Sequence, residues 1–279
     1  MERINLSVER SFSEVITATF NFLKQEIRPF LAGFAVLVLP IIVLIVLAFN
    51  GVLTNSLFLS EEEMMVNPAL IASMYMNMMW VGLLSGLLSF WSELFVLAYL
   101  RVYRNHYLAG NQEMITLKEV WQMMLDKLLM FWGWSIIFGL IIFVGLMFCI
   151  IPGIYFGIAL IFGTYYVVMK DVSVGDAFSA SWNLIKGNWW MTFGLVVVLG
   201  LLIAVVSFIF ELPSFILGVG TGISGELPNT YLLIAVVLFA YIGKFLLNMV
   251  LYLGLGMQFF SLQEREEHTT LLGKIENMG

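Results

Sequence analysis

Residues 133–169 read GWSIIFGLIIFVGLMFCIIPGIYFGIALIFGTYYVVM and contain no charged side chain. A transmembrane helix needs about 20 mostly apolar residues, so this stretch is long enough for two short ones. Pro152 and Gly153 separate its halves, because both residues interrupt helices. The run is too uniformly apolar for barrel strands, in which polar and apolar residues alternate. It therefore predicts a helical hairpin in a membrane, with helices at about 133–151 and 153–169.

The composition of the whole chain also indicates a membrane protein. Of its 279 residues, 61% are hydrophobic and only 11% are charged, against roughly a quarter charged in an average soluble domain. These values exclude a soluble enzyme and a disordered chain, and a single cysteine excludes a disulfide scaffold. We therefore predict an all-α polytopic membrane protein, a single membrane domain over 1–279. Its six transmembrane helices include four further apolar runs, at 31–53 (kinked by Pro40), 76–100, 189–210 and 231–259.

The third and fourth predicted helices are short. At 1.5 Å per residue they reach about 26–28 Å, slightly less than an average hydrocarbon core. Either they cross a thinned bilayer, or they form a hairpin whose uncharged tip stays buried. Both ends emerge on the same side in either case, so the remaining topology is the same.

The basic residues determine the predicted orientation. Outside the predicted helices, every basic residue falls on one side of the membrane. By the positive-inside rule this side is cytoplasmic, so both termini are expected in the cytoplasm, with the protein in the cell (inner) membrane. The formal net charge of −6 then comes mainly from an acidic outer face, which carries Glu61, Glu62, Glu63, Glu211 and Glu226 and no base. The cytoplasmic bases are Arg3, Arg10, Lys24, Arg28, Arg101, Arg104, Lys118, Lys127, Lys170, Lys186, Arg265 and Lys274.

Three cytoplasmic segments resemble one another. Each begins with a hydroxyl residue that we predict as a helix N-cap, and each has an aromatic residue five positions later. Glu119 and Asp176 lie three residues after their predicted caps, which is the spacing of a capping box. The predicted caps are Ser7, Thr116 and Ser173, and the aromatic residues are Phe12, Trp121 and Phe178.

The ends of the first and third segments are also alike. Residues 18–24, ATFNFLK, parallel residues 180–186, ASWNLIK, but the first copy is four residues further from its predicted cap. This pattern predicts three repeats, each a cytoplasmic amphipathic helix followed by a transmembrane hairpin. We place the repeats at about 6–108, 115–171 and 172–262, with a cytoplasmic tail at 263–279.

The third segment and the apolar run before it carry a resemblance over about 133–205. The motifs are Ile151-Pro152-Gly153-Ile154-Tyr155, Phe162 with Tyr165-Tyr166, Asp176-Ala177-Phe178, Ser181-Trp182 and Lys186-Gly187-Asn188-Trp189. With these motifs the chain resembles uncharacterised bacterial integral membrane proteins that are similar to the membrane domain of glycerophosphoryl diester phosphodiesterases. The resemblance implies a multi-helix membrane domain with no agreed activity. It transfers no catalytic residue to this chain.

Two charged residues lie inside predicted helices. Glu93 lies roughly 12 Å from the cytoplasmic boundary and Lys244 roughly 14–22 Å from it, at 1.5 Å per residue. An unpaired charge at such depth is costly, so we predict a Glu93–Lys244 pair, with Asn248 one helical turn beyond Lys244 on the same face. Its role is either structural or that of a proton-coupled or substrate-gating element. A snorkelling Lys244 would instead leave Glu93 unpaired.

A basic and aromatic cluster lies at the cytoplasmic end of the second helix. Arg101, Arg104 and His106 are candidates for contacts with an anionic lipid headgroup. Alternatively they anchor the helix at the interface, as basic and aromatic residues commonly do.

The residues supply no recognisable catalytic machinery. No Ser/His/Asp constellation, zinc-spaced His pair or phosphate loop is present, so we predict a protein that is not an enzyme and has no cofactor and no metal site. The favoured function is that of a scaffold, an accessory subunit or a lipid-handling bundle. The alternative is a small transporter or channel-like protein that uses Glu93 and Lys244. Expected partners are membrane lipids, with a protein partner or a second copy of the chain as further candidates, and no nucleic acid.

Overall fold

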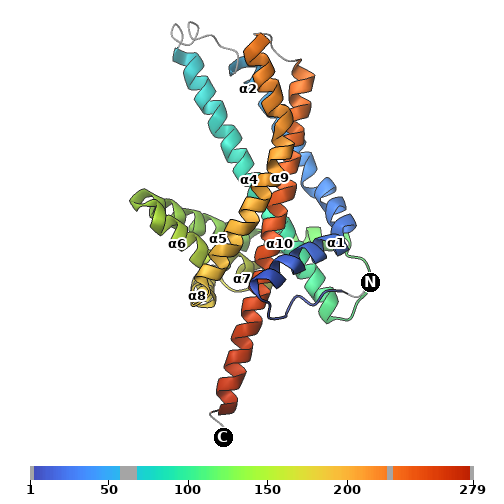
Figure 1. Ribbon diagram of the computed structural model, residues 1–279, viewed down its shortest axis with the longest axis vertical. Coiled ribbons are helices and arrows are strands. Elements are labelled where there is room, and N and C mark those ends of the chain that lie inside the picture. Colours follow the sequence, from blue (N-terminus) through green and yellow to red (C-terminus); the bar gives the residue numbers. More distant parts are fainter. Residues whose placement is uncertain (1–2, 57–67, 225–228, 277–279) are drawn as a thin grey trace. The chain divides into compact units, whose positions relative to one another are not determined.

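The computed structural model describes residues 3–56, 68–224 and 229–276, which form helices and no strand (Figure 1). Their bounds are α1 Phe12–Leu37, α2 Leu39–Ser56, α4 Pro68–Leu108, α5 Leu117–Phe148, α6 Ile150–Leu160, α7 Gly163–Lys170, α8 Val174–Ile185, α9 Trp189–Ser224 and α10 Thr230–Glu276.

Six helical stretches are long and apolar enough to cross a membrane, as the sequence predicted. They correspond in order to the six predicted helices, but each extends further than its apolar core because charged flanks continue the same helix. A chain with six such stretches is typical of a multi-pass membrane protein. The stretches are Phe12–Leu47, Ile71–Leu108, Leu117–Phe148, Ile150–Lys170, Trp189–Gly220 and Thr230–His268.

The turn of the α5–α6 hairpin was predicted at the wrong residues. The helix breaks at Cys149, whose backbone is extended, and not at Pro152-Gly153. Pro152 lies in the first turn of α6, where a missing amide proton costs no helical hydrogen bond. Gly153 lies inside α6 because the two helices approach closely there. A Cβ built on Gly145 falls 3.0 Å from the Cα of Gly153.

The predicted fourth helix is divided into α6 and α7 at residues 161–162. The first residue of α7, Gly163, lies directly against the indole of Trp134 on α5. A Cβ at this position would fall 1.8 Å from Cζ2 of Trp134, so only glycine fits. Trp134 is fully buried together with Leu160 and Val167, which makes this contact the core between α5, α6 and α7.

Two of the three predicted N-caps are confirmed. The Thr116 side chain accepts a hydrogen bond from the Glu119 amide in a complete capping box, and the Ser173 side chain accepts one from Asp176. The third prediction, Ser7, is wrong: α1 begins at Phe12, and Ser11 and Glu14 form its capping contacts. The Glu14 carboxylate accepts from the Ser11 amide at 2.7 Å.

The corrected cap changes the comparison of the first and third segments. Counted from Ser11 and Ser173, the similar stretches 18–24 and 180–186 start at the same offset, so no extra turn separates them. The first segment, however, is no separate interfacial helix, because α1 continues through Pro29 into the first apolar run. The three-repeat organisation stays a prediction, as do its boundaries and the interpretation of 1–279 as a single domain.

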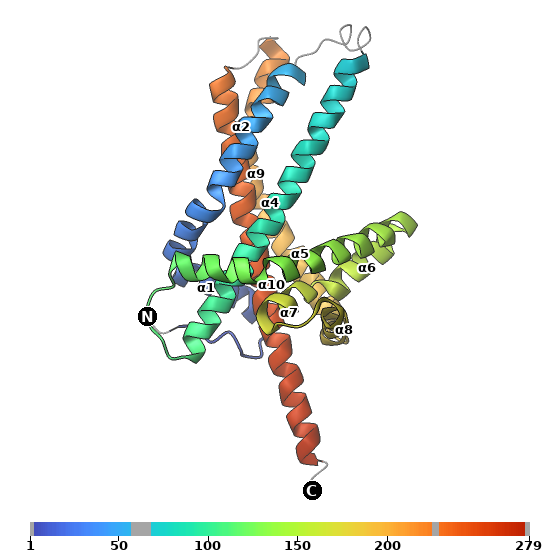
Figure 2. The same cartoon turned by 180° about the vertical axis from the view of Figure 1, so that it is seen from behind.

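The chain packs as two compact units, and several helices pass through both. The first unit comprises 1–31, 93–202 and 249–279. Its core is aromatic: Phe22 and Tyr103 pack edge to face between α1 and α4, and Tyr165 packs on Phe259 between α7 and α10. Within this unit, the α5–α6 hairpin extends away from α10 and does not run along it (Figures 1 and 2).

The second unit comprises 32–92 and 203–248. The Trp91 indole donates to the carbonyl of Leu37 at 3.0 Å, across the end of α1. The hydroxyls of Ser85 and Tyr241 lie 3.4 Å apart and join α4 to α10. Phe210 of α9 lies over Gly243 of α10, so these two helices are in close contact as well.

Candidate functional site

An ion-pair cluster in the first unit joins α4, α5 and the end of α7. Arg101 donates to both carboxylate oxygens of Asp171, at 2.8 and 2.6 Å, and also to the carbonyl of Val168. The Lys127 ammonium lies 2.6 Å from Asp171 and 2.5 Å from Asp126. Asp171 directly follows α7 in the left-handed conformation, with φ of 57°. The cluster therefore fixes the end of the α6–α7 segment to two other helices.

The charges in this cluster are balanced. The hydrogen bonds from Arg101, together with the ammonium of Lys127, hold the pKa of the Asp171 carboxyl well below its usual range. The aspartate thus stays ionised at every physiological pH. Two cations and the two carboxylates of Asp126 and Asp171 leave no net positive charge for an incoming anion.

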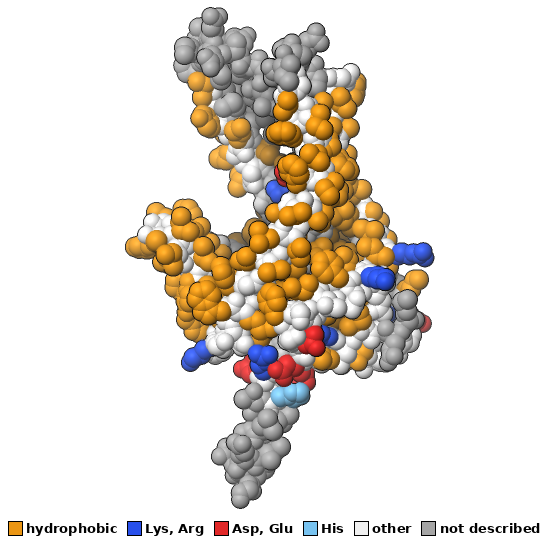
Figure 3. Space-filling view, in the orientation of Figure 1, with side chains coloured by type: hydrophobic (Ala, Val, Ile, Leu, Met, Phe, Trp, Pro, Cys, Tyr) orange, Lys and Arg blue, Asp and Glu red, His pale blue; other side chains and the backbone are white. Residues whose placement is uncertain are grey.

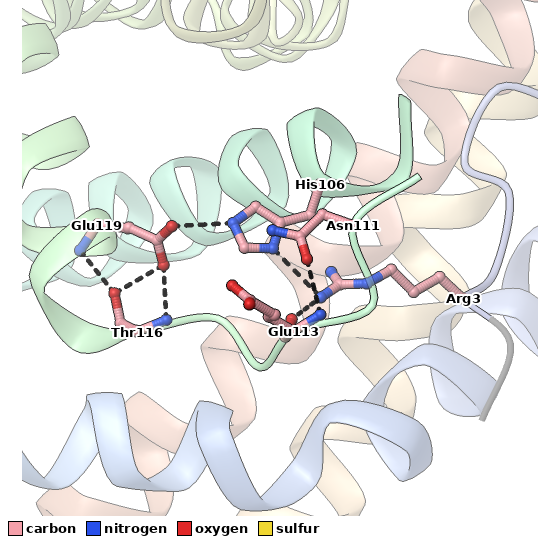
Figure 4. Close-up of polar contacts among 6 residues, drawn as sticks. All are labelled: Arg3, His106, Asn111, Glu113, Thr116 and Glu119. Carbon is pink, nitrogen blue, oxygen red and sulfur yellow. Dashed lines mark hydrogen bonds and ion pairs between the residues drawn. The ribbon is translucent and has the colours of Figure 1, made fainter. Parts of the chain in front are cut away.

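A second polar cluster surrounds His106 at the end of α4 (Figure 4). The Nε2 atom of His106 lies 2.9 Å from Oε1 of Glu119, and its Nδ1 atom lies 3.4 Å from the Arg3 guanidinium. An arginine only donates, so Nδ1 accepts, and the proton of the neutral ring lies on Nε2 and is donated to Glu119. The same Arg3 nitrogen donates to the carbonyl of Glu113. The N-terminal segment is thereby tied to the loop between α4 and α5.

Glu119 is the shared acceptor of this cluster. Besides His106, it accepts from the amide and the hydroxyl of Thr116, at 2.8 and 2.6 Å, in the capping box of α5. A polar pocket of about 350 Å³ opens beside it, between α4 and α5. Since Glu119 already has three donors, the pocket contains a carboxylate that is engaged in holding the helix start. Its lining is Val102, Asn105, His106, Glu119, Gln122, Met123 and Asp126.

The three predicted headgroup contacts are engaged within the protein. Arg101 is paired with Asp171 and His106 with Glu119. The Arg104 guanidinium lies over the ring of Phe260, with its carbon 5.6 Å from the ring centre. These contacts favour the anchoring alternative, and the headgroup role of Arg101, Arg104 and His106 stays a prediction.

Glu93 lies within the first unit and is partly buried. Its carboxylate accepts a hydrogen bond from the side chain of Thr164, a buried residue of α7. The hydroxyl of Tyr165 donates to the carbonyl of Tyr252 at 2.7 Å, and both tyrosines are near enough to interact electrostatically with Glu93. Glu93 therefore has a polar neighbourhood of its own on α7 and α10.

The other two members of the predicted intramembrane site belong to the second unit. Lys244 is exposed on α10, and Asn248 follows it by one helical turn on the same face. Because Glu93 is in the first unit, the Glu93–Lys244 pair stays a prediction.

An apolar groove of about 370 Å³ lies between α6 and the start of α9. Every side chain in it is aliphatic or aromatic, and the Tyr155 ring stacks on the Trp189 ring with centroids 5.6 Å apart. Such a lining suits hydrocarbon and offers no group for chemistry. The groove residues are Ile151, Ile154, Tyr155, Trp189, Trp190 and Phe193.

Within 3–56, 68–224 and 229–276, no three His, Cys, Asp or Glu side chains come together in a way that could hold a metal ion. Four of the five acidic residues of the predicted outer face, Glu61, Glu62, Glu63 and Glu226, lie outside the described residues.

Two members of the ion-pair cluster, Asp171 and Lys127, escaped the sequence prediction. Like Arg101, both lie just outside predicted transmembrane helices on the same predicted side, which indicates a similar depth in the membrane. The choice of partners, however, depends on helix rotation, which the spacing does not fix. The role of Thr164 as the hydrogen-bond partner of Glu93 could not be predicted, because a single threonine in an apolar helix is common.

Comparison with known protein families, with curated proteins and with solved structures finds no match for this sequence. The resemblance to proteins similar to the membrane domain of glycerophosphoryl diester phosphodiesterases therefore stays a prediction.

Proposed function

We propose that the protein is a non-enzymatic, multi-pass protein of the bacterial inner membrane that holds membrane lipid in its helical bundle. Both termini and the charged clusters around Arg101 and His106 would then lie on the cytoplasmic side, in agreement with the positive-inside rule. The clusters are internally paired and serve to hold helices, which supports a binding role over a catalytic one.

The observation that carries the proposal is the outward face of the α5–α6 hairpin. It presents large apolar side chains, with Phe148 84% and Leu129 86% exposed. Figure 3 shows apolar side chains over this arm of the first unit. A hollow of about 570 Å³ in the same hairpin has no polar side chain, so its natural occupant in a bilayer is an acyl chain. Its lining is Leu140, Ile141, Val144, Gly145, Phe148, Pro152 and Phe156.

Native mass spectrometry of the protein released from lipid nanodiscs tests this proposal. We expect retained phospholipid, reduced in Val144→Trp, which fills the hollow, but unchanged in Val197→Trp, a change of the same size on α9. The control residue is comparably exposed: Val144 is 49% and Val197 40% exposed. Retention no greater than that of an unrelated six-helix membrane protein would contradict lipid holding. A stoichiometric protein subunit in place of lipid would instead favour a scaffold or accessory role.

The polar neighbourhood of Glu93 favours the alternative of a small transporter or channel-like protein. If Glu93 carries protons or gates a substrate with Lys244, Glu93→Gln should abolish flux in proteoliposomes, while Glu113→Gln, an exposed acid of the α4–α5 loop, should not. The charge-swapped double variant Glu93→Lys/Lys244→Glu should recover stability that each single swap loses. Absence of flux in the unmodified protein would reject the alternative.

A further inference from the structure

We propose that the groove between α6 and α9 binds a phospholipid with an anionic headgroup, with an acyl chain along the aromatic lining and the phosphate at Lys186. This inference rests on the proposed lipid-holding function and adds to it a site and a headgroup class. The site is separate from the α5–α6 hollow: the two linings share no residue.

The groove is preformed by interlocking aromatic rings. Trp189 stacks between Tyr155 of α6 and Phe193 of α9, with ring centroids 5.6 and 5.1 Å away. Its indole nitrogen also donates to the carbonyl of Tyr155 at 3.3 Å, which fixes the ring that separates the two helices. A wall whose rings are already ordered loses little entropy when a chain binds.

The lining determines which part of the ligand the groove accepts. No charged, amide or hydroxyl-bearing aliphatic side chain lines it, and its polar groups are the phenol of Tyr155 and the indole N–H groups of Trp189 and Trp190. A peptide or a sugar would leave its own polar groups unpaired there, which is costly. A hydrocarbon chain has no such groups, so the ligand part in the groove is an acyl chain.

A basic residue comes shortly before the part of α9 that lines this groove. Lys186 ends α8 only three residues before Trp189, and it is exposed. It takes part in none of the ion pairs found among the described residues, unlike Arg101 and Lys127. Its ammonium is therefore available to a ligand whose chain occupies the groove.

The adjoining tryptophan indicates the level of the membrane interface. Trp190 is 77% exposed and lies at the start of α9, four residues after Lys186. Tryptophan is enriched at the headgroup level of membranes, and a basic residue there attracts anionic lipid. In this arrangement the groove would hold the acyl chain, Trp190 would lie at the membrane interface, and Lys186 would meet the phosphate of an anionic phospholipid.

The experiment measures lipid preference in nanodiscs of phosphatidylcholine that contain one fifth phosphatidylglycerol. Native mass spectrometry then counts each lipid retained by the unmodified protein and by three variants. Lys186→Gln removes the charge, and Lys118→Gln is its matched control, because Lys118 is also exposed and has no ion pair among the described residues. Ile154→Trp fills the groove at a side chain that is 44% exposed.

We expect phosphatidylglycerol to be enriched in the unmodified protein and in Lys118→Gln. Lys186→Gln should lower that enrichment about fivefold, the effect of one basic residue near an anionic surface. Ile154→Trp should remove the lipid bound in this groove, whichever headgroup it carries, and leave the lipid of the α5–α6 hollow in place. Retention of the two lipids in the proportion of the nanodisc, unaffected by Lys186→Gln, overturns this inference but leaves lipid holding intact. Retention of no lipid by any form overturns the proposed function itself.

Discussion

The guanidinium of Arg101 forms a bidentate ion pair with Asp171, which connects the end of α4 to the residue that follows α7. Arg101 also donates to the carbonyl of Val168 in the last turn of α7, where carbonyl groups lack helical partners. One side chain therefore neutralises an aspartate and caps a helix end. Lys127 adds α5 to the same junction.

We predict that Asp171→Asn destabilises the protein by about 1 kcal/mol, a value kept low because the Asp171 side chain is 48% exposed and partly screened by water. The substitution leaves Arg101 and Lys127 facing each other without their shared anion. Thermal unfolding in detergent should show a melting temperature lower by roughly 2–4 °C. The control is Glu113→Gln, which removes an acid that has no ion pair among the described residues. It should leave the melting temperature unchanged.

The ion pair of Asp171 also predicts how the stability of the protein changes in acid. The pKa of Asp171 is lower in the folded protein than in the unfolded chain, where it is about 3.9. The contribution of Asp171 to the free energy of unfolding is therefore complete above that value, and it declines as the pH falls from about 4 towards the pKa in the folded protein. The difference in melting temperature between the unmodified protein and Asp171→Asn should be constant from pH 7 to 5 and smaller at pH 3. A difference that grows on acidification would contradict the ion-pair assignment.

Gly163 is predicted to tolerate no side chain. Gly163→Ala places a methyl group inside the Trp134 indole, and relieving that overlap should cost about 1–3 kcal/mol. Gly139→Ala is the control, because Gly139 lies in the interior of α5 with no atom within 4 Å of a built Cβ. Fluorescence-detected gel filtration after heating measures both. Equal melting behaviour of the two variants would show that α7 does not pack on Trp134.

The sequence predicted what depends on composition and local chemistry. Six apolar runs and the caps Thr116 and Ser173 could be found because length and capping boxes are readable from neighbouring residues. The turn at Cys149 and the break before Gly163 could not, because both depend on contacts between helices. The same holds for the pairing of Arg101 with Asp171, since several acids and bases share that predicted side.

The corrected cap of α1 has a direct test. Ser11→Ala removes a hydroxyl that donates to the Glu14 carboxylate at 2.7 Å, and loss of one such hydrogen bond typically costs about 1 kcal/mol. Ser7→Ala should cost almost nothing, because Ser7 precedes the helix by a full turn. Melting temperatures of the two variants distinguish the caps. A larger loss of stability in Ser7→Ala than in Ser11→Ala would show that Ser7 caps the helix, as the sequence alone predicted.

Chemical labelling of Cys149 tests whether the α5–α6 hairpin crosses the membrane. It is the chain's one cysteine, it is exposed, and it lies at the turn of a hairpin that extends away from α10 (Figure 1). If the hairpin does not cross the whole bilayer, its uncharged tip stays within the lipid. Cys149 should then react only slowly with a membrane-permeant maleimide in intact cells, because a thiol within hydrocarbon stays protonated, and should resist a charged, impermeant one.

The control for this labelling is Glu62→Cys in a Cys149→Ser background, which places a thiol in the predicted outer segment. Both reagents should label it from outside, and the impermeant reagent should fail at a thiol introduced at Lys118 until the cells are opened. Labelling of Cys149 by the impermeant reagent at the rate of the outer control would show that α5 and α6 cross the whole bilayer. The Phe148 and Ile150 side chains beside it, 84% and 68% exposed, would then face water, which is an unfavourable position for two large apolar groups.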